Sequence, residues 1–465
     1  METYDIKYPR AVAIWAGQAA ALLIVSMPLW WLLGLDQAAW LAAGFALGAS
    51  AIATPDLPRG IAIAATCFVG AVAVSGFLGA SGLRWFTFAR EILIVSAFFG
   101  ALAGVASMGM GSRPFRNLVG AVAVFMTVSA ALTLFAFLIQ DPLTFRTPFA
   151  DLVPDAIADT RLGELSLIVR SLGSPSTFLG SDYFLRPQGL FLFSTSEAVA
   201  LAASIPLLLA ASFWWPRFGW HLRVVAGLGV TALFATTTRV PIAALSGAAV
   251  VAWIARGWTR GHLIVPLNRK TLPVIFVVLL GALGAALALG VSDPILELVA
   301  ARNVETRASL YEATLERWAD RPLLGWGTEV DWIPTDQPAG TPQPNATPTP
   351  PPGSVDLDAL PPLGSHSQYL GVLFKQGIVG LLLFVVVVGY VSAAAVRLFR
   401  RNATRDDLLV VGFLATVISA VTESLWLDPA TAVCVAILWG LIVGRARHGP
   451  TGAAIDRGPQ EAARA

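Results

Sequence analysis

Apolar runs recur along the whole 465-residue chain, each about 17–25 residues long, the length that crosses the hydrocarbon core of a bilayer as a helix. Hydrophobic residues make up 56% of the sequence and charged residues 13%, whereas ordinary soluble proteins are about 25% charged. So few charges cannot cover the surface of several water-soluble domains. The sequence therefore predicts a polytopic membrane protein and excludes soluble enzymes, nucleic-acid binders and secreted scaffolds.

The expected fold is all-α, with about 12 transmembrane helices separated by turn-rich strings such as TPDLPRG and GSRPFRN. The expected spans are residues 11–33, 37–54, 61–80, 86–108, 117–139, 188–212, 222–238, 240–255, 272–291, 368–396, 408–427 and 429–444. They divide the chain into four parts, namely helices 1–9 in residues 1–291, a large extracytoplasmic loop at 292–367, helices 10–12 at 368–446 and a disordered tail at 447–465.

Two segments between spans are long. Residues 140–187 mix apolar and charged residues, and we expect them to lie partly along the membrane surface. Residues 292–367 begin with a helix-like stretch and continue into GTPQPNATPTPPPG, a polyproline-biased tract that cannot build a core.

Basic residues in short loops predict the orientation, because they are enriched on the cytoplasmic side. Only Arg84 and Arg239 fall in short loops at one set of span ends. The other set has seventeen: Lys7, Arg10, Arg59, Arg113, Arg116, Arg217, Arg223, Arg256, Arg260, Arg269, Lys270, Arg397, Arg400, Arg401, Arg405, Arg445 and Arg447. Both termini are therefore expected in the cytoplasm, and both long segments outside.

Ionisable residues at membrane level are costly and commonly functional. Nearly all of those at or within span ends map to the outer half: Arg84, Arg90, Glu91, Arg186, Glu197, Arg239, His366, Lys375, Glu423 and Asp428. Each taken singly is compatible with snorkelling or an interhelical pair. Snorkelling would decorate both faces, however, and an ion-coupled transporter would place its charges near the midplane between repeated halves. The pattern favours a polar cavity that opens outward.

Two motifs stand at the start of expected spans. In FLRPQGLFLFSTSEAVALA, Arg186 precedes a Pro-Gln-Gly turn and Glu197 follows a Ser/Thr cluster, whose hydroxyls could equally satisfy the helix backbone. In LFATTTRVPIAALSG, Arg239 lies between two short spans of about 17 and 16 residues, so its turn is expected to be recessed below the outer surface. A guanidinium there suits a diphosphate, with a lipid headgroup as the alternative.

Two more motifs lie in and after the large loop. A helix read from about Val304 places Arg307, Tyr311 and Trp318 on one face and ends at Pro322, although an amphipathic helix on the outer leaflet would look similar. Tyr311 and Arg321 are candidates for substrate binding. In GSHSQYLGVLFKQGIVGLL, His366 is the only histidine expected outside. Imidazole is largely neutral at pH 7 and accepts a proton from a hydroxyl, although a lone histidine is more often structural.

Taken in order, these residues resemble the O-antigen ligase and polymerase family of bacterial membrane glycosyltransferases. The resemblance rests on Arg-Pro-Gln-Gly, Thr-Thr-Thr-Arg, Arg307 before a helix ending in Pro-Leu-Leu-Gly-Trp-Gly, and His-Ser-Gln-Tyr-Leu, over about residues 184–396. Ten residues separate His366 from Gly377, as in the ligase members. The sequence departs from the family in having Ser367 where an asparagine usually follows the histidine, and in the long Pro/Thr tract.

The resemblance implies an outward cavity roofed by the large loop, in a multi-pass protein of the bacterial plasma (inner) membrane. Such enzymes transfer a glycan from an undecaprenyl-diphosphate carrier to an acceptor hydroxyl, with inversion in a single displacement. In ligases the acceptor is the lipid A core of lipopolysaccharide, and in polymerases it is another lipid-linked unit. Arg239 and Arg307 match the diphosphate-binding arginines and His366 the proposed base, with Arg186 and Glu197 as further candidates for substrate binding.

Three alternatives stay open. The enzyme is a polymerase instead of a ligase, the acceptor is another surface glycolipid, or the protein transports lipid-linked sugars. No cofactor and no metal are expected, because the sequence has no His/Cys cluster with metal-ligand spacing. Metal-dependent membrane glycosyltransferases resemble one another in a long acidic first outer loop, whereas this chain has only Gly34-Leu35-Asp36-Gln37. We expect Asp36 to cap a helix.

Overall fold

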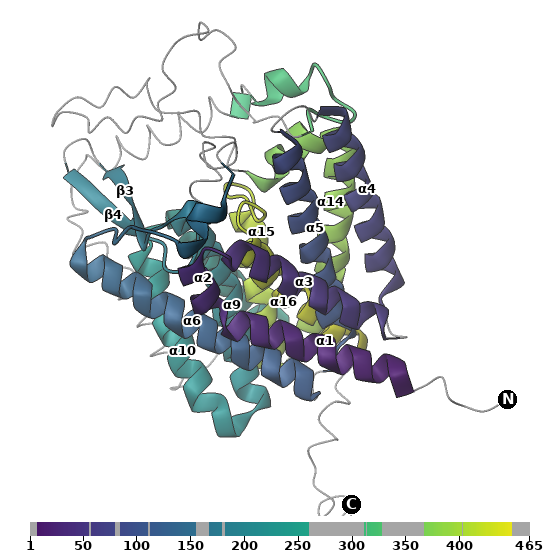
Figure 1. Ribbon diagram of the computed structural model, residues 1–465. Coiled ribbons are helices and arrows are strands. Elements are labelled where there is room, and N and C mark those ends of the chain that lie inside the picture. The colour runs from purple at the N-terminus through teal and green to yellow at the C-terminus, as the bar shows by residue number, and fades with distance from the viewer. Residues whose placement is uncertain are drawn as a thin grey trace, which may run out of the picture.

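The computed structural model describes residues 7–54, 57–79, 84–109, 112–154, 167–178, 182–259, 311–312, 314–327, 367–401 and 403–448. Within these ranges the chain is mostly helical (Figure 1). The helices are α1 (Lys7–Val25), α2 (Met27–Leu33), α3 (Asp36–Ile52), α4 (Arg59–Gly79), α5 (Arg84–Ser107), α6 (Arg113–Ile139), α9 (Ser194–Trp214), α10 (Pro216–Ala235), α11 (Arg239–Thr259), α14 (Gln368–Phe399), α15 (Thr404–Ser419) and α16 (Pro429–His448).

Among the described residues, eight helices are long and apolar enough to cross a membrane, or nine if α1 and α2 form one bent span. The chain is therefore a multi-pass membrane protein, as the sequence predicts. The helices α3 and α15 have 17 and 16 residues and fall short of that test. The expected span at 272–291 lies outside the described residues, so the number twelve stays a prediction.

The expected single span at 11–33 is two helices, which meet at a bend of 57°. Ser26 lies at the bend, and its hydroxyl donates to the carbonyl oxygens of Leu22 (2.8 Å) and Leu23 (3.1 Å). Pro28 follows in the first turn of α2, where a residue without an N–H is tolerated. The bend depends on one serine hydroxyl and one proline, and neither residue interrupts the apolar run in the sequence. The sequence therefore predicts a single span.

The centre of the bundle is formed by α9 and α16. In their most apolar stretches, 89% of α9 and 100% of α16 are buried inside the protein, against 28% for α4 and for α11. Both central helices are rich in alanine and apolar on every side, which is the pattern of a helix surrounded by other helices. Residues at the first turns of α9 and α16 therefore sit among the neighbouring helices instead of facing lipid.

Two small antiparallel sheets precede α9. The strand β1 (Phe145–Arg146) pairs with β2 (Val169–Arg170), and β3 (Gly173–Phe178) pairs with β4 (Asp182–Pro187). Figure 1 shows β3 and β4 side by side beyond one end of the helices. The expectation of an all-α fold is therefore wrong in this detail. Strands of two to six residues offer too few positions for an apolar–polar alternation to be recognised in the sequence.

The helices on either side of Arg239 are longer than expected. The structure gives 20 residues to α10 and 21 to α11, which at 1.5 Å per residue is about 30 Å, enough to cross a bilayer core. The argument that two short spans hold Arg239 below the membrane surface is therefore wrong. Arg239 is the first residue of α11, and its side chain is exposed.

Candidate functional site

The helices α5, α9, α11, α14 and α16 all begin at the same end of the bundle, which we call the motif end. Long-range contacts define it. The Arg90 guanidinium on α5 donates to the Leu427 carbonyl oxygen before α16 (2.7 Å), and the Gln368 backbone N–H at the start of α14 donates to the Ala420 carbonyl oxygen (2.9 Å). Every described residue that the sequence marks as a candidate lies at this end.

Arg186 and the Thr-Thr-Thr-Arg turn are in contact, although they are 52 residues apart in the sequence. The Arg186 guanidinium on β4 donates to Thr238 Oγ1 (3.1 Å), and this hydroxyl lies 3.5 Å from the Ser194 carbonyl oxygen at the start of α9. Arg239 is the next residue along the chain. The structure thus places two of the predicted cationic residues on adjoining segments of the motif end.

The threonines shape this turn through their hydroxyls. Thr236 donates to the Leu233 carbonyl oxygen (2.8 Å) and accepts from the Thr238 backbone N–H (3.4 Å), so it ends α10 and supports the next residues. Thr237 has a positive φ of 54°, which is uncommon for a β-branched residue. Such a backbone persists only where neighbouring contacts fix it, and here the flanking hydroxyls supply them.

Glu197 lies inside the protein, with 0% of its surface exposed. Its Oε1 atom accepts from Thr133 Oγ1 (2.6 Å) and Ser129 Oγ (2.9 Å) on α6. Oε2 is buried and has no hydrogen-bond partner among the described groups. The Glu197 carboxylate therefore connects α9 to α6.

Through Ser129, Glu197 also supports the turn that contains Gly189. The Leu190 backbone N–H donates to Ser129 Oγ (3.2 Å). Gly189 has a positive φ of 52°, and an added Cβ would collide with Ser129 and Glu197. Only glycine fits this position, which explains the last residue of the Arg-Pro-Gln-Gly motif.

Residues 188–193 form a buried, non-helical segment, so the span expected at 188–212 begins as a helix only at Ser194. The segment is also held from α16, because the Leu192 N–H donates to Asp428 Oδ2 (3.0 Å). Burial raises the pKa of the Asp428 carboxyl, against the lowering effect of the backbone N–H bonds from Leu192 and Ala430. The Asp428 carboxylate, just before α16, thus bonds this stretch of backbone directly, and the Glu197 carboxylate on α9 supports it through Ser129.

A buried ion pair that the sequence does not predict completes this region. The Arg170 guanidinium on β2 donates to Asp36, and both side chains are almost completely buried. Gln37 joins the pair to Asp428, with its Nε2 atom 3.4 Å from a carboxylate oxygen of each aspartate. The expectation that Asp36 caps a helix is wrong, because the N-cap position belongs to Leu35 and Asp36 makes no capping bond.

Breaking this pair should destabilise the protein. We expect Arg170→Ala to lower the free energy of unfolding by about 3–5 kcal/mol, because the Asp36 carboxylate would stay buried without its counter-charge. The measurement is thermal and denaturant unfolding in detergent. The control is Arg146→Ala, which removes a 2.8 Å ion pair with Asp151 between side chains that are 66% and 81% exposed; such exposed pairs are worth about 1 kcal/mol or less. Equal stability changes in the two variants would contradict the prediction.

The two substrate-binding candidates within the large loop, Tyr311 and Arg321, belong to the segment that packs near the start of α14 (Figure 1). The Tyr311 side chain is half-buried, and its hydroxyl has no hydrogen-bond partner among the described groups. Arg321 is exposed, and its guanidinium carbon lies 4.1 Å from the centre of the Trp326 ring. The short helix that contains Thr314 and Leu315 ends before Pro322, as the sequence predicts. In this helix Thr314 is buried and Leu315 is exposed.

His366 and Arg307 lie outside the described residues. The residue after His366 is Ser367, the N-cap of α14, whose hydroxyl accepts from the Leu370 backbone N–H (3.3 Å). Arg307 stands four residues before Tyr311 in the sequence. Of the seven candidates, the structure therefore places Arg186, Glu197, Arg239, Tyr311 and Arg321 at the motif end.

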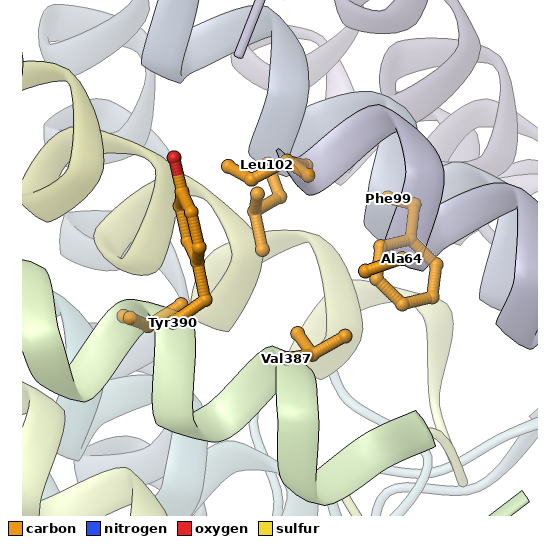
Figure 2. A pocket seen from close by; sticks show the side chains of 7 residues that line it. Ala64, Phe99, Leu102, Val387 and Tyr390 are labelled. Atoms are coloured by element: carbon orange, nitrogen blue, oxygen red, sulfur yellow. The ribbon is translucent and has the colours of Figure 1, made fainter. Parts of the chain in front are cut away.

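A small hollow elsewhere in the described structure is separate from these residues. It is lined by Ala64, Phe99, Leu102, Val387 and Tyr390 on α4, α5 and α14 (Figure 2). Its lining is apolar and contains none of the candidates. It lies away from the motif end, because Gly60 at the start of α4 is beside Tyr390, whereas Gly76 near the other end of α4 is beside Phe88.

Residues 224–385 match the family model Wzy_C, which is described as O-antigen ligase. The matched range contains Arg239, Arg307, Tyr311, Arg321 and His366 and lies within the range of the resemblance found from the motifs. No curated protein matches the chain. Through this segment, the chain is similar to the O-antigen ligase family.

Proposed function

We propose that this protein transfers a glycan from an undecaprenyl-diphosphate carrier to an acceptor hydroxyl on the outer face of the bacterial plasma membrane. The match to the O-antigen ligase family model indicates an enzyme of the O-antigen ligase or polymerase type. The observation that carries the finer proposal is the contact between Arg186 and Thr238, because it joins two cationic motifs at one end of the bundle. The excess of basic residues at the opposite span ends supports cytoplasmic termini and an outward-facing site.

In the proposed mechanism His366 removes the proton from the acceptor hydroxyl. The hydroxyl oxygen attacks the anomeric carbon, and the bond from that carbon to the diphosphate oxygen breaks with its electron pair going to the diphosphate. Arg239 and Arg307 neutralise the charge that grows there, and their planar guanidinium groups each offer two parallel donors. A single displacement inverts the anomeric centre.

The other candidates act around this centre. Arg186, held by Thr238, extends the cationic surface beside Arg239. Tyr311 offers a hydroxyl and Arg321 an exposed guanidinium on the segment that follows Arg307. Glu197 is fully buried between α6 and α9, so its support of the 188–193 segment is a more direct role than contact with a sugar.

A product assay separates the ligase from the polymerase. Purified protein in liposomes receives an undecaprenyl-diphosphate-linked oligosaccharide, with and without a lipid A core acceptor, and the products are resolved by size. A single shifted product that requires the acceptor identifies a ligase, which we expect. A ladder formed from the lipid-linked units alone identifies a polymerase. No glycan transfer with either acceptor, together with movement of the carrier across the bilayer, would identify a transporter.

We expect transfer to continue in the presence of EDTA. His366 and the two arginines supply both the proton acceptor and the charge stabilisation that a metal would otherwise provide. The chain contains one Asp-x-Asp triplet, Asp356-Leu357-Asp358, which lies outside the described residues. The rate is measured with and without EDTA, and again in an Asp356→Asn/Asp358→Asn variant. A loss of transfer that added Mg²⁺ or Mn²⁺ restores in the parent protein, but not in the variant, would contradict the metal-independent mechanism.

A further inference from the structure

The helix α14 is interrupted at Gly377, which has φ 66° and ψ −167°. Two other glycines with positive φ, Gly325 (67°) and Gly327 (66°), lie in the Pro-Leu-Leu-Gly-Trp-Gly turn. The break and the turn face each other directly. A Cβ added at Gly377 would collide with the Leu323 backbone, and one added at Gly325 would collide with the Phe374 backbone. All three positions require glycine, because an L side chain would meet both strain and a clash.

Backbone hydrogen bonds join the turn to the break in both directions. The N–H groups of Trp326 and Gly327 donate to the carbonyl oxygens of Phe374 and Lys375, each at 2.8 Å. In return, the N–H groups of Ile378 and Val379 donate to the carbonyl oxygens of Pro322 (2.8 Å) and Leu323 (3.3 Å).

A break in a membrane helix leaves such groups without their usual partners, and each unsatisfied group costs several kcal/mol in an apolar medium. The turn supplies the missing partners. We call this interlocked arrangement of residues 322–327 and 374–379 the clasp.

Aromatic and cationic side chains extend the clasp to the short helix before it, residues 314–318. The Trp326 ring stacks on Phe374 with centroids 6.4 Å apart and planes 16° apart. Its indole N–H donates to the Arg317 carbonyl oxygen (2.7 Å), and the Arg317 guanidinium lies over the same ring. A hydroxyl from α4 also reaches the break, since Ser75 donates to the Lys375 carbonyl oxygen. Figure 1 shows this short helix beside the ends of α4, α5 and α14.

We propose that the clasp is a positioning element for the proposed site, because it joins the segment that follows Arg307 in the sequence to the helix that follows His366. Arg307 stands four residues before Tyr311 in the sequence, and His366 immediately precedes Ser367, the N-cap of α14. In the sequence, one arm of the clasp begins 15 residues after Arg307 and the other begins 8 residues after His366. The ten residues between His366 and Gly377 are the first turns of α14 up to the break. This inference rests on the proposed function.

The decisive variant is Gly377→Ala, with Gly371→Ala and Gly389→Ala as matched controls in the same helix. Among the described residues, nothing lies within 4 Å of a Cβ at either control position. We expect Gly377→Ala to lower kcat about 100-fold, because a displacement of about 1 Å has an effect of that size on an aligned reaction. The KM for the lipid-linked donor should change less than about threefold, since no donor contact is removed. The two controls should keep kcat within about twofold.

A second pair of variants tests the turn without altering α14. Trp326→Phe keeps a ring stacked on Phe374, whereas Trp326→Ala removes both the stack and the indole N–H bond to Arg317. We expect the phenylalanine variant to keep most of kcat and the alanine variant to lose at least about tenfold. If Gly377→Ala does not fold, this pair decides the question, and equal kcat values for the two would overturn the proposal.

Proteolysis tests whether the clasp is intact, independently of activity. Trypsin cleavage after Arg317 is followed by mass spectrometry on the full-length protein in liposomes. We expect slow cleavage in the wild type and in both control glycine variants, and faster cleavage in Gly377→Ala. Unchanged kcat or unchanged protection in a folded Gly377→Ala protein would overturn the inference. If no form, wild type included, transfers glycan, the proposed function fails, and the proteolysis result alone decides whether the clasp holds the helix.

Discussion

Replacing His366 with alanine is expected to lower the rate of glycan transfer by about 10²- to 10⁴-fold, the contribution typical of general base catalysis. His366 is the only one of the four histidines that the charge pattern places on the outer side. Without it, the acceptor hydroxyl would have to lose its proton to water. The rate is measured with purified protein at saturating donor and acceptor.

The matched control is His221→Ala. His221 is exposed near the start of α10, at the end of the bundle opposite the motif end. We expect this variant to keep the wild-type rate, because the position is remote from the site. A His366→Ala protein that retains more than about a tenth of the wild-type rate would show that the histidine is not the base.

The second large effect is expected at the two arginines. Arg239→Ala and Arg307→Ala should each lower kcat by about 10²- to 10³-fold, the usual effect of removing one group that stabilises developing negative charge. Lysine at either position should restore only part of the rate, because an ammonium cannot form two parallel bonds to a phosphate. The comparison requires single-turnover kinetics, which separate the transfer step from substrate binding.

Arg217→Ala is the control for both substitutions. Arg217 is an exposed arginine next to the start of α10, at the opposite end from Arg239. The Arg217→Ala variant should have the same kcat and KM as the wild type. A loss of only a few-fold in Arg307→Ala would remove Arg307 from the mechanism, and a similar result in Arg239→Ala would leave that residue as a lipid-facing cation.

Properties that depend on local sequence were predictable. The apolar runs indicated a multi-pass membrane protein. Helices occupy most of each expected span within the described residues, and the longest exceptions are residues 188–193 and 420–427, which are not helical. The order of four short motifs indicated the family, and the match over residues 224–385 confirms it. Both signals are contained in neighbouring residues, so no knowledge of the packing was needed.

Contacts between distant segments were not predictable. Asp36 resembled a helix cap because its only visible context was a four-residue turn, whereas its partner Arg170 lies 134 residues away. The segment at 188–193 resembled a helix start because its residues are apolar. It is instead held in a non-helical conformation by Ser129 on α6 and by Asp428 just before α16. Such partners are identified only when the chain is folded.

Gly377 illustrates an intermediate case. Its spacing from His366 was visible in the sequence and pointed to the ligase members, but the physical reason was not. The structure supplies that reason, since Gly377 interrupts α14 and the interruption is satisfied by a turn about 50 residues earlier in the chain. A motif defined by spacing thus corresponds to a pair of backbone segments that only glycine allows to meet.

The central claim is that glycan leaves a diphosphate carrier and reaches a hydroxyl in one displacement. The most direct measurement supplies purified protein in liposomes with a donor whose sugar and carrier are separately labelled, and then quantifies both products and the anomeric configuration of the new linkage. The account predicts equal amounts of released undecaprenyl diphosphate and glycosylated acceptor, with inverted configuration, and neither product in His366→Ala. Retained configuration, or carrier release without an acceptor, would contradict it.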